Sequence, residues 1–243
     1  MVRPDMEPTT RGRVRVETTA KRVRTYADGR PVADTTRALL VWENPHFPTY
    51  YFPLDDVETG ELKQTGKTKH SPSRGDGALH DVAGRPDAAL VYGDDAPLEE
   101  IRGHVRFDWD AMDAWFEEDE EVFYHARDPY TRVDILPSSR HIRVEIDGVT
   151  VADSRRARIL FETGLRPRYY LPKTDVRLDL LTRSDTATFC PYKGRAEYWS
   201  VGEGKDLVWS YPTPLPESQK IAGLVSFYNE KLDIYVDGVL EER

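Results

Sequence analysis

The chain repeats itself without an insertion or a deletion. Val32–Val82 falls on Val151–Val201 when the sequence is shifted by 119 positions, so 51 residues align in one block. This period is the size of a domain, well beyond the roughly 20 to 50 residues of solenoid repeats. We therefore expect two tandem domains of one fold, related by a pseudo-two-fold axis. Identities include Ala33-Asp34 with Ala152-Asp153, Tyr50-Tyr51 with Tyr169-Tyr170, Pro53 with Pro172, and Asp56-Val57 with Asp175-Val176.

Short runs with the alternation of β-strands, bounded by turn residues, dominate both copies. Asp28-Gly29 and Asp147-Gly148 predict a hairpin near the start of each copy. Helical periodicity is weak and is confined to residues 97–103, 216–223 and 110–122. The pattern predicts an all-β fold with few short helices. The expected strands are 13–18, 22–26, 38–43, 49–52, 143–146, 149–152, 159–162, 168–171, 188–192, 196–201, 207–210, 225–228 and 233–236.

The repeat also suggests where the domains begin and end. We expect a tail over residues 1–12, a first repeat domain over 13–116, a linker over 117–140 and a second repeat domain over 141–243. The linker is acidic and then aromatic, which predicts that it packs on a domain instead of swinging freely. Whether its His125, Arg127 and Arg132 reach a ligand or only pair with buried carboxylates is left open by the sequence.

Composition excludes several classes of function. The chain of 243 residues has 34 Lys and Arg against 43 Asp and Glu, a net charge of −9, which argues against a nucleic-acid partner. It has no apolar run long enough for a membrane span and no apolar core of a signal peptide near the start, so we expect a cytoplasmic protein without a membrane partner. Cys190 is the only cysteine, and the six histidines are scattered, so we expect neither a disulfide nor a metal site.

The segment Gly60–Thr68 resembles a phosphate-binding P-loop but has five residues between its glycines, where the motif needs four. The spacing matters because the backbone N–H groups must curl around one phosphate. The aligned stretch of the second copy, residues 179–187, lacks both glycines. We interpret the segment as an exposed polar loop.

The most concentrated chemical signal is the segment Thr188–Ser200, which reads as a hairpin with a Lys-Gly turn. Alternation places Cys190 and Tyr192 on one face, and the turn places Lys193 at the tip on a flexible stem. Tyrosine and tryptophan side chains can wall a pocket while their polar tips fix a ligand. Such aromatics more often belong to the core of a β-domain, and a lone cysteine such as Cys190 is more often a small buried hydrophobe than a nucleophile.

The first copy differs from the second at this hairpin. Its turn residues Pro72 and Gly75 are retained, whereas the reactive positions are replaced, which indicates a working second copy and a degenerate first copy. Glu43 of the first copy aligns with Glu162 of the second, so both copies keep a glutamate after an apolar strand. This carboxylate is a fold element, a ligand group or both. The replaced pairs are Cys190 by Ser71, Tyr192 by Ser73, Lys193 by Arg74, Tyr198 by Leu79 and Trp199 by His80.

These motifs closely resemble the domain of unknown function 427 family. The resemblance covers the second copy almost end to end and implies a small all-β domain similar to the β-tent class, whose zinc-binding relatives use paired cysteines that this chain lacks. The family also has a nucleotidyltransferase-like label, but the sequence has no Gly-Ser turn followed by an Asp-x-Asp pair. The resemblance rests on residues 151–154, 161–165, 167–172, 175–176, 190–194, 198–199, 209–212 and 223–228.

Our first hypothesis is a small-molecule-binding protein with a polar and aromatic pocket in the second copy, for a small anionic or planar ligand. Lys193 would engage an anionic group, and Glu162 would accept a hydrogen bond or act as a base. The alternatives are a non-enzymatic protein-interaction module and, more weakly, a nucleotidyltransferase-like enzyme. The expected ligand-binding residues are Glu162, Tyr169, Cys190, Tyr192, Lys193, Trp199, Trp209 and Tyr211.

Overall fold

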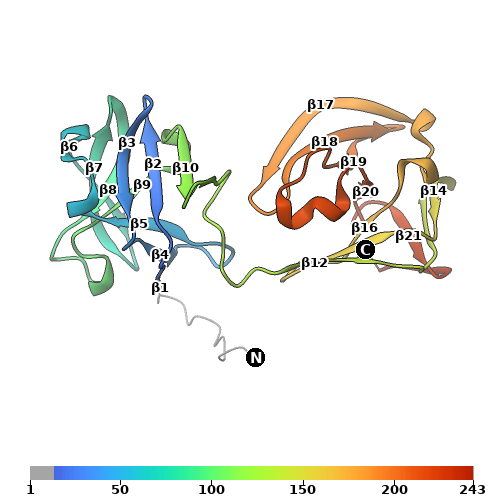
Figure 1. Cartoon of the computed structure of the whole chain (residues 1–243), viewed down its shortest axis with the longest axis horizontal. Helices are drawn as coiled ribbons and strands as arrows, with labels where there is room; N and C mark the ends of the chain where they lie inside the picture. Colours follow the sequence, from blue (N-terminus) through green and yellow to red (C-terminus); the bar gives the residue numbers. More distant parts are fainter. Residues whose placement is uncertain (1–13, 243) are drawn as a thin grey trace. The chain divides into compact units, whose positions relative to one another are not determined.

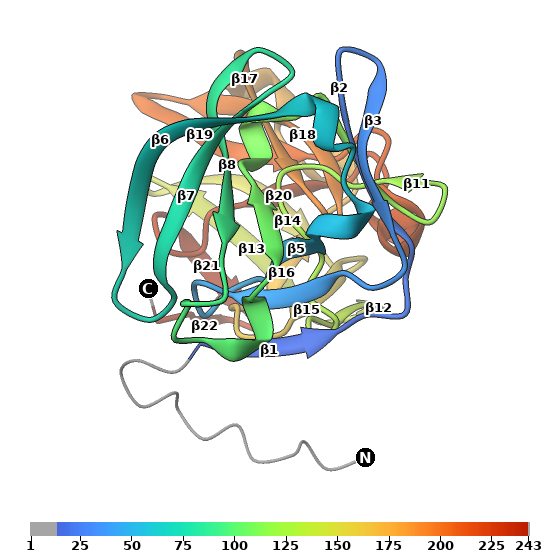
Figure 2. The same ribbon diagram turned by 90° about the vertical axis from the view of Figure 1, so that its left-hand side faces the viewer.

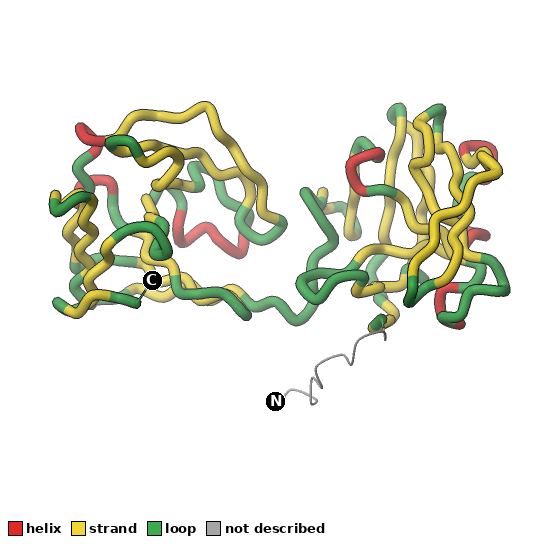
Figure 3. Tube along the Cα trace, turned by 180° about the vertical axis from the view of Figure 1, so that it is seen from behind, coloured by secondary structure: helices red, strands yellow, loops and turns green. Residues whose placement is uncertain are grey.

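Strands form nearly everywhere that the sequence alternates, and the helical pieces are all short 3-10 turns (Figure 3). The computed structural model describes residues 14–242. The expected tail over residues 1–12 lies outside this range. The chain divides into two units, of which the first ends at Asp128 and the second begins at Pro129. Within the described residues, no helix has the length and the apolar composition needed to span a bilayer.

The first unit carries strands β1 to β11 and turns η1 to η4 (Figure 1). Their bounds are β1 Arg15–Thr18, β2 Val23–Ala27, β3 Arg30–Thr35, β4 Leu39–Trp42, β5 Thr49–Pro53, η1 Leu54–Asp56, η2 Thr59–Glu61, β6 Leu62–Ser71, β7 Gly75–Val82, β8 Arg85–Tyr92, η3 Glu99–Ile101, β9 His104–Phe107, η4 Trp109–Ala111, β10 Ala114–Glu117 and β11 Glu120–Glu121.

The second unit carries strands β12 to β22 and turns η5 to η7 in the same order. Their bounds are β12 Val133–Pro137, β13 Ile142–Ile146, β14 Val149–Ser154, β15 Arg158–Glu162, β16 Arg168–Tyr170, η5 Lys173–Asp175, η6 Leu178–Leu180, β17 Leu181–Cys190, β18 Gly194–Val201, β19 Gly204–Ser210, η7 Pro216–Ile221, β20 Val225–Phe227, β21 Asp233–Val236 and β22 Val239–Leu240.

The two units have one topology. In the first, a seven-stranded sheet runs β1-β4-β5-β9-β8-β7-β6 and a four-stranded sheet runs β11-β10-β2-β3. In the second, the sheets β12-β15-β16 and β17-β18-β19-β20 meet where Leu171 and Val225 exchange backbone hydrogen bonds of 2.7 and 2.9 Å. The combined order β12-β15-β16-β20-β19-β18-β17 repeats that of the first unit. The tandem all-β prediction is therefore confirmed.

Each unit buries two apolar clusters, one on each face of its long sheet. The larger lies between the long sheet and a short four-stranded sheet, which is β11-β10-β2-β3 in the first unit and β14-β13-β21-β22 in the second. It includes Phe52 and Trp115 in the first unit and Leu171 and Phe227 in the second. The smaller lies on the opposite face, under the bent hairpin β6–β7 (Figure 2) or β17–β18, which arches over η7 (Figure 1). This second face, turned away from the short sheet, holds the polar groups described below.

Two local expectations are wrong. Residues 62–68, interpreted as part of an exposed loop, belong to strand β6, because this strand pairs with β7 across a register shift between Gln64 and Thr68. Gly66, with φ of +77°, falls within that shift. Residues 110–122, where weak helical periodicity was noted, contain the end of η4 followed by the hairpin β10–β11, since β10 pairs with β2 along its whole length. Most of β6 is exposed, as the polar composition indicated.

The expected linker over residues 117–140 is shared between the units. Its first part packs on the first unit: the rings of Phe47 and His125 stack at 3.8 Å, and Asp128 accepts a hydrogen bond of 2.9 Å from the Trp42 indole. Arg127 pairs with Glu120 at 2.5 Å. Its last part forms β12, the first strand of the second unit. His125 and Arg127 thus each contact a residue of their own unit.

Candidate functional site

Adjacent tyrosines of β16 divide between the two faces of the long sheet, as the alternation of a strand requires. Tyr169 packs in the larger cluster, and its hydroxyl donates a hydrogen bond to Glu241. Tyr170 packs in the smaller cluster on the opposite face. The first unit repeats this division, with Tyr50 in the larger cluster and Tyr51 in the smaller.

A buried ion pair lies beside the smaller cluster of the second unit. Glu162 ends β15, and Lys193 lies in the turn between β17 and β18. Lys193 Nζ donates to Glu162 Oε2 at 2.5 Å, and each side chain is only 10% exposed. The turn is held in place because the Lys193 carbonyl accepts a hydrogen bond of 3.2 Å from the Leu215 backbone N–H. Lys193 is therefore not the exposed, flexible group that its turn position predicted.

Aromatic side chains of three strands pack around this pair. Trp209 Nε1 donates a hydrogen bond of 3.1 Å to the Tyr170 hydroxyl, and the Tyr198 and Thr188 hydroxyls are 2.8 Å apart. Tyr211 follows β19 in the same cluster and is 6% exposed. Within residues 14–242, the Tyr211 hydroxyl has no hydrogen-bond partner. The cluster is thus apolar in area but lined with phenol and indole groups.

The carboxylate of Glu162 acts electrostatically on these phenols. Burial raises the pKa of Tyr170 and of Tyr211 above the usual value, and the negative charge of Glu162 acts in the same direction on both. Cys190 itself is half-buried. The tip of the β17–β18 hairpin, which begins at Cys190, thus brings the Lys193 ammonium to the Glu162 carboxylate beside the aromatic cluster.

The structure brings together five of the eight residues expected from the sequence. We call them, with Tyr170 and Tyr198, the second-copy site; its members are Glu162, Tyr170, Cys190, Lys193, Tyr198, Trp209 and Tyr211.

Two expected residues lie elsewhere, and the third, Tyr192, lies in the turn beside Lys193. Tyr169 and Trp199 pack in the larger cluster, and Lys173 Nζ is 5.9 Å from the Trp199 ring. Tyr192 is half-buried, and its backbone carbonyl accepts a hydrogen bond from the Ser218 hydroxyl. Tyr170, which sequence reasoning missed, was signalled by the identity of Tyr51 and Tyr170 in the two copies. Tyr198 carried no such signal, because the first copy has leucine there.

The first unit has an equivalent cluster, so the substitutions at its hairpin remove only part of the chemistry seen in the second copy. Glu43 directly follows β4 and accepts a hydrogen bond of 2.7 Å from the Tyr51 hydroxyl. Arg74, at the position of Lys193, has Nη2 3.7 Å from Glu43 Oε2, and its Nε is 3.4 Å from the Tyr92 hydroxyl. Arg106 Nε is 3.4 Å from Glu43 Oε1. The carboxylate, a cation and two tyrosines are common to both copies.

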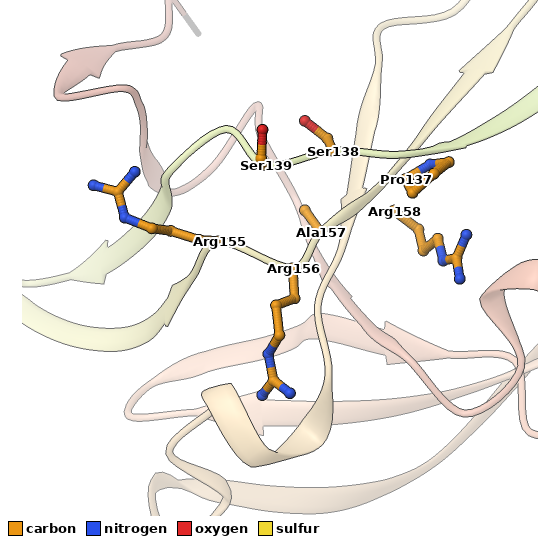
Figure 4. A pocket seen from close by; sticks show the side chains of 7 residues that line it. All are labelled: Pro137, Ser138, Ser139, Arg155, Arg156, Ala157 and Arg158. Carbon is orange, nitrogen blue, oxygen red and sulfur yellow. The ribbon is translucent and has the colours of Figure 1, made fainter.

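A surface pocket of the second unit carries three arginines but does not form a convergent site. It is lined by Ser138, Ser139 and the segment 155–158. In Figure 4 the guanidinium groups of Arg155, Arg156 and Arg158 point in three different directions. Arg156 is already paired with Asp175. Among residues 14–242, no group of three or more His, Cys, Asp or Glu side chains could hold a metal ion.

The fold and the paired clusters define a tandem all-β protein in which two copies of one domain have diverged around a common carboxylate and cation. A family model matches residues 15–118 and again residues 134–238, so the chain belongs to the family described as a domain of unknown function (DUF427). The first matched range contains strands β1 to β10 and the second covers strands β12 to β21 apart from Val133, so only the last strand of each unit, β11 or β22, lies outside. No curated protein matches the chain closely enough to count as a relative.

Proposed function

We propose that the protein binds a small molecule at the second-copy site. The main supporting observation is the Glu162–Lys193 ion pair, which lies beside aromatic side chains and in which each side chain is only 10% exposed. A buried ion pair contributes little to stability compared with apolar residues of the same shape, because both charges lose their water. Ionisable groups held in such surroundings are typical of functional sites.

Unused hydrogen-bonding capacity indicates the chemistry of the ligand. An ammonium has three donors, and Lys193 spends one on Glu162. The Tyr211 hydroxyl adds a donor for which residues 14–242 provide no acceptor. A ligand carrying acceptor oxygens, such as a carboxylate, would accept from both groups. The Trp209 and Tyr198 rings suit a planar portion of the same molecule. A planar, anionic small molecule is therefore the proposed ligand class.

Native mass spectrometry of freshly purified protein tests this proposal. We expect a retained small molecule in the wild type and a reduced retained fraction in Tyr211→Phe, which removes only a hydroxyl. The matched control is Tyr169→Phe, on the opposite face of the sheet, which should retain the ligand fully. Equal retention in both variants would place the ligand elsewhere.

A titration with benzoate, a planar carboxylate, provides a second test. We expect saturable binding to the wild type and binding up to about tenfold weaker in Tyr211→Phe, the loss of one hydrogen bond. Benzoate that binds the Tyr211→Phe and Tyr169→Phe variants equally would contradict the proposed orientation. We also propose a cytoplasmic location, which agrees with an unpaired Cys190.

A protein-interaction role is the second candidate, favoured by the apolar surface of the second unit. Phe161 is 42% exposed and Phe189 is 47% exposed, whereas the first copy has Trp42 and His70 at these positions. Other exposed apolar residues of this unit are Leu136, Val149, Leu165, Leu178, Val239 and Leu240. Cross-linking of the wild type and of Phe161→Ser/Phe189→Ser in a cell extract tests this role, since a partner held by the apolar surface would be lost from the double variant.

A further inference from the structure

We infer that the first copy holds its own binding site, selective for a small oxyanion, in which Arg74 and Arg106 are the cationic ligands. We call it the first-copy site; it comprises Glu43, Tyr51, Arg74, Tyr92 and Arg106. This inference concerns a different unit from the proposed function and stands independently of it.

Charge is the first argument. Two guanidinium groups face a single carboxylate, because Glu43 is the only carboxylate within 4 Å of Arg74 or Arg106 in the described part of the chain. The side chains are 15% exposed for Arg74, 24% for Arg106 and 18% for Glu43, so water screens them weakly. One positive charge is left without a counter-charge in a partly buried place. A bound anion would supply it.

Hydrogen bonding is the second argument. The contacts of Glu43 with Arg74 and Arg106, at 3.7 and 3.4 Å, are longer than charge-assisted hydrogen bonds, and Glu43 Oε1 already accepts from Tyr51. Arg106 Nε is buried and has no hydrogen-bond partner. A buried donor without a partner is unfavourable, because it has lost its hydrogen bond to water and gained none in return. An oxyanion matches the fork of a guanidinium group and would satisfy such donors.

The second copy provides an internal comparison. Arg106 pairs with Leu90 between β9 and β8, and Ser226 pairs with Trp209 between β20 and β19, so Ser226 takes the place of Arg106. There Lys193 closes on its carboxylate at 2.5 Å, and the nearby Arg168 is paired with Glu230 at 2.6 Å, so the charges balance. The excess positive charge is thus a property of the first copy alone. The exchange of Arg106 for Ser226 accounts for the different ligand chemistry of the two copies.

The two tyrosines of the first-copy site do not neutralise its excess positive charge. The Tyr92 hydroxyl is 3.4 Å from Arg74 Nε, a long contact with a neutral group. Burial raises the pKa of Tyr51, with the charge of Glu43 acting in the same direction, so this phenol keeps its proton. Tyr51 therefore adds no negative charge. An external oxyanion with two or more oxygens remains the group that the site fits.

Calorimetric titration of the full chain with inorganic phosphate at constant ionic strength tests the inference. We expect saturable binding by the wild type, weakened by about tenfold or more in Arg106→Gln, which loses a charge-assisted interaction. Glu43→Gln should tighten binding, since it removes the competing carboxylate. The matched control Arg37→Gln alters an exposed arginine of the same unit, paired with Asp56, and should bind as the wild type does.

Opposite effects of Arg106→Gln and Glu43→Gln cannot arise from general unfolding, so they support the site even where one variant is less stable. A parallel titration with acetate separates a phosphate-selective site from one that takes any carboxylate, and either result agrees with an oxyanion site. Phosphate and acetate that both fail to saturate the wild type would overturn the inference, as would unchanged binding in Arg106→Gln.

Discussion

Lys193 in the β17–β18 turn reaches Glu162 at the end of β15, 31 positions earlier in the chain, and the two side chains form an ion pair of 2.5 Å. The contact ties the hairpin tip to the opposite end of the long sheet. In the first copy Arg74 and Glu43 take the same places, at 3.7 Å and with a second arginine present. The same carboxylate–cation pair is thus short in the second copy and long in the first, and this distinguishes the chemistry of the two sites.

Breaking the tight pair should destabilise the protein strongly. Lys193→Met leaves Glu162 charged and buried without its partner, which costs about 3–5 kcal/mol for a buried pair. The double variant Lys193→Met/Glu162→Leu should recover much of that loss, because no unpaired charge remains. Denaturant unfolding measures both. The control Arg156→Met, in which the arginine side chain is 65% exposed, should cost at most about 1 kcal/mol.

Two glycines with nearly the same backbone conformation should respond differently to alanine. Gly75 has φ of +79° and Gly84 has φ of +78°, but only at Gly75 would a Cβ meet a neighbour, 2.4 Å from Pro97 Cδ. Gly84→Ala should cost about 1–2 kcal/mol through the left-handed conformation alone. Gly75→Ala should cost about 1–3 kcal/mol more through the clash. Equal midpoints in thermal unfolding would show that Pro97 moves aside freely.

Mild acid should weaken the first unit through His125. Burial against Phe47 lowers the pKa of His125 below the usual 6.5, although Ala126 and Asp128 oppose this shift. The folded state therefore binds this proton less readily than the unfolded state does. Stability contributed by neutral His125 is fully present above about pH 6.5 and is lost as the pH falls below that value. The free energy of unfolding, measured above and below pH 6.5 for the wild type and for His125→Gln, isolates this dependence. The same pH dependence in the two proteins would contradict it.

Alkaline pH should also unfold the protein through its buried phenols. Burial raises the pKa of Tyr51, Tyr170 and Tyr211 in the folded state above the unfolded value near 10. Their contribution is thus complete below about pH 10 and declines as the pH rises above it. Ultraviolet absorbance should show phenolate forming together with the loss of tertiary structure. Ionisation of all tyrosines while the near-ultraviolet circular dichroism stays native would refute this prediction.

Much of the fold of residues 14–242 could be predicted from the sequence alone. The gapless match between Val32–Val82 and Val151–Val201 required two similar domains, and alternation with turn glycines located most strands, since both signals are local. The hairpin around Lys193 was found in the same way. The strand nature of residues 62–71 was missed because glycines and charges favour loops, while long-range pairing with β7 decided otherwise.

The composition of the sites depended on contacts that no local pattern contains. Alternation shows that Tyr169 and Tyr170 point to opposite faces, but only the packing of the two sheets decides which face holds the ion pair. Lys193 looked exposed because turns lie at surfaces; its burial comes from Glu162, 31 positions away. Arg106 had no signal at all, since its role arises where β9 is placed next to β5 and β8. The repeat and its strands follow from neighbours along the chain, whereas the charge balance of each site follows from neighbours in space.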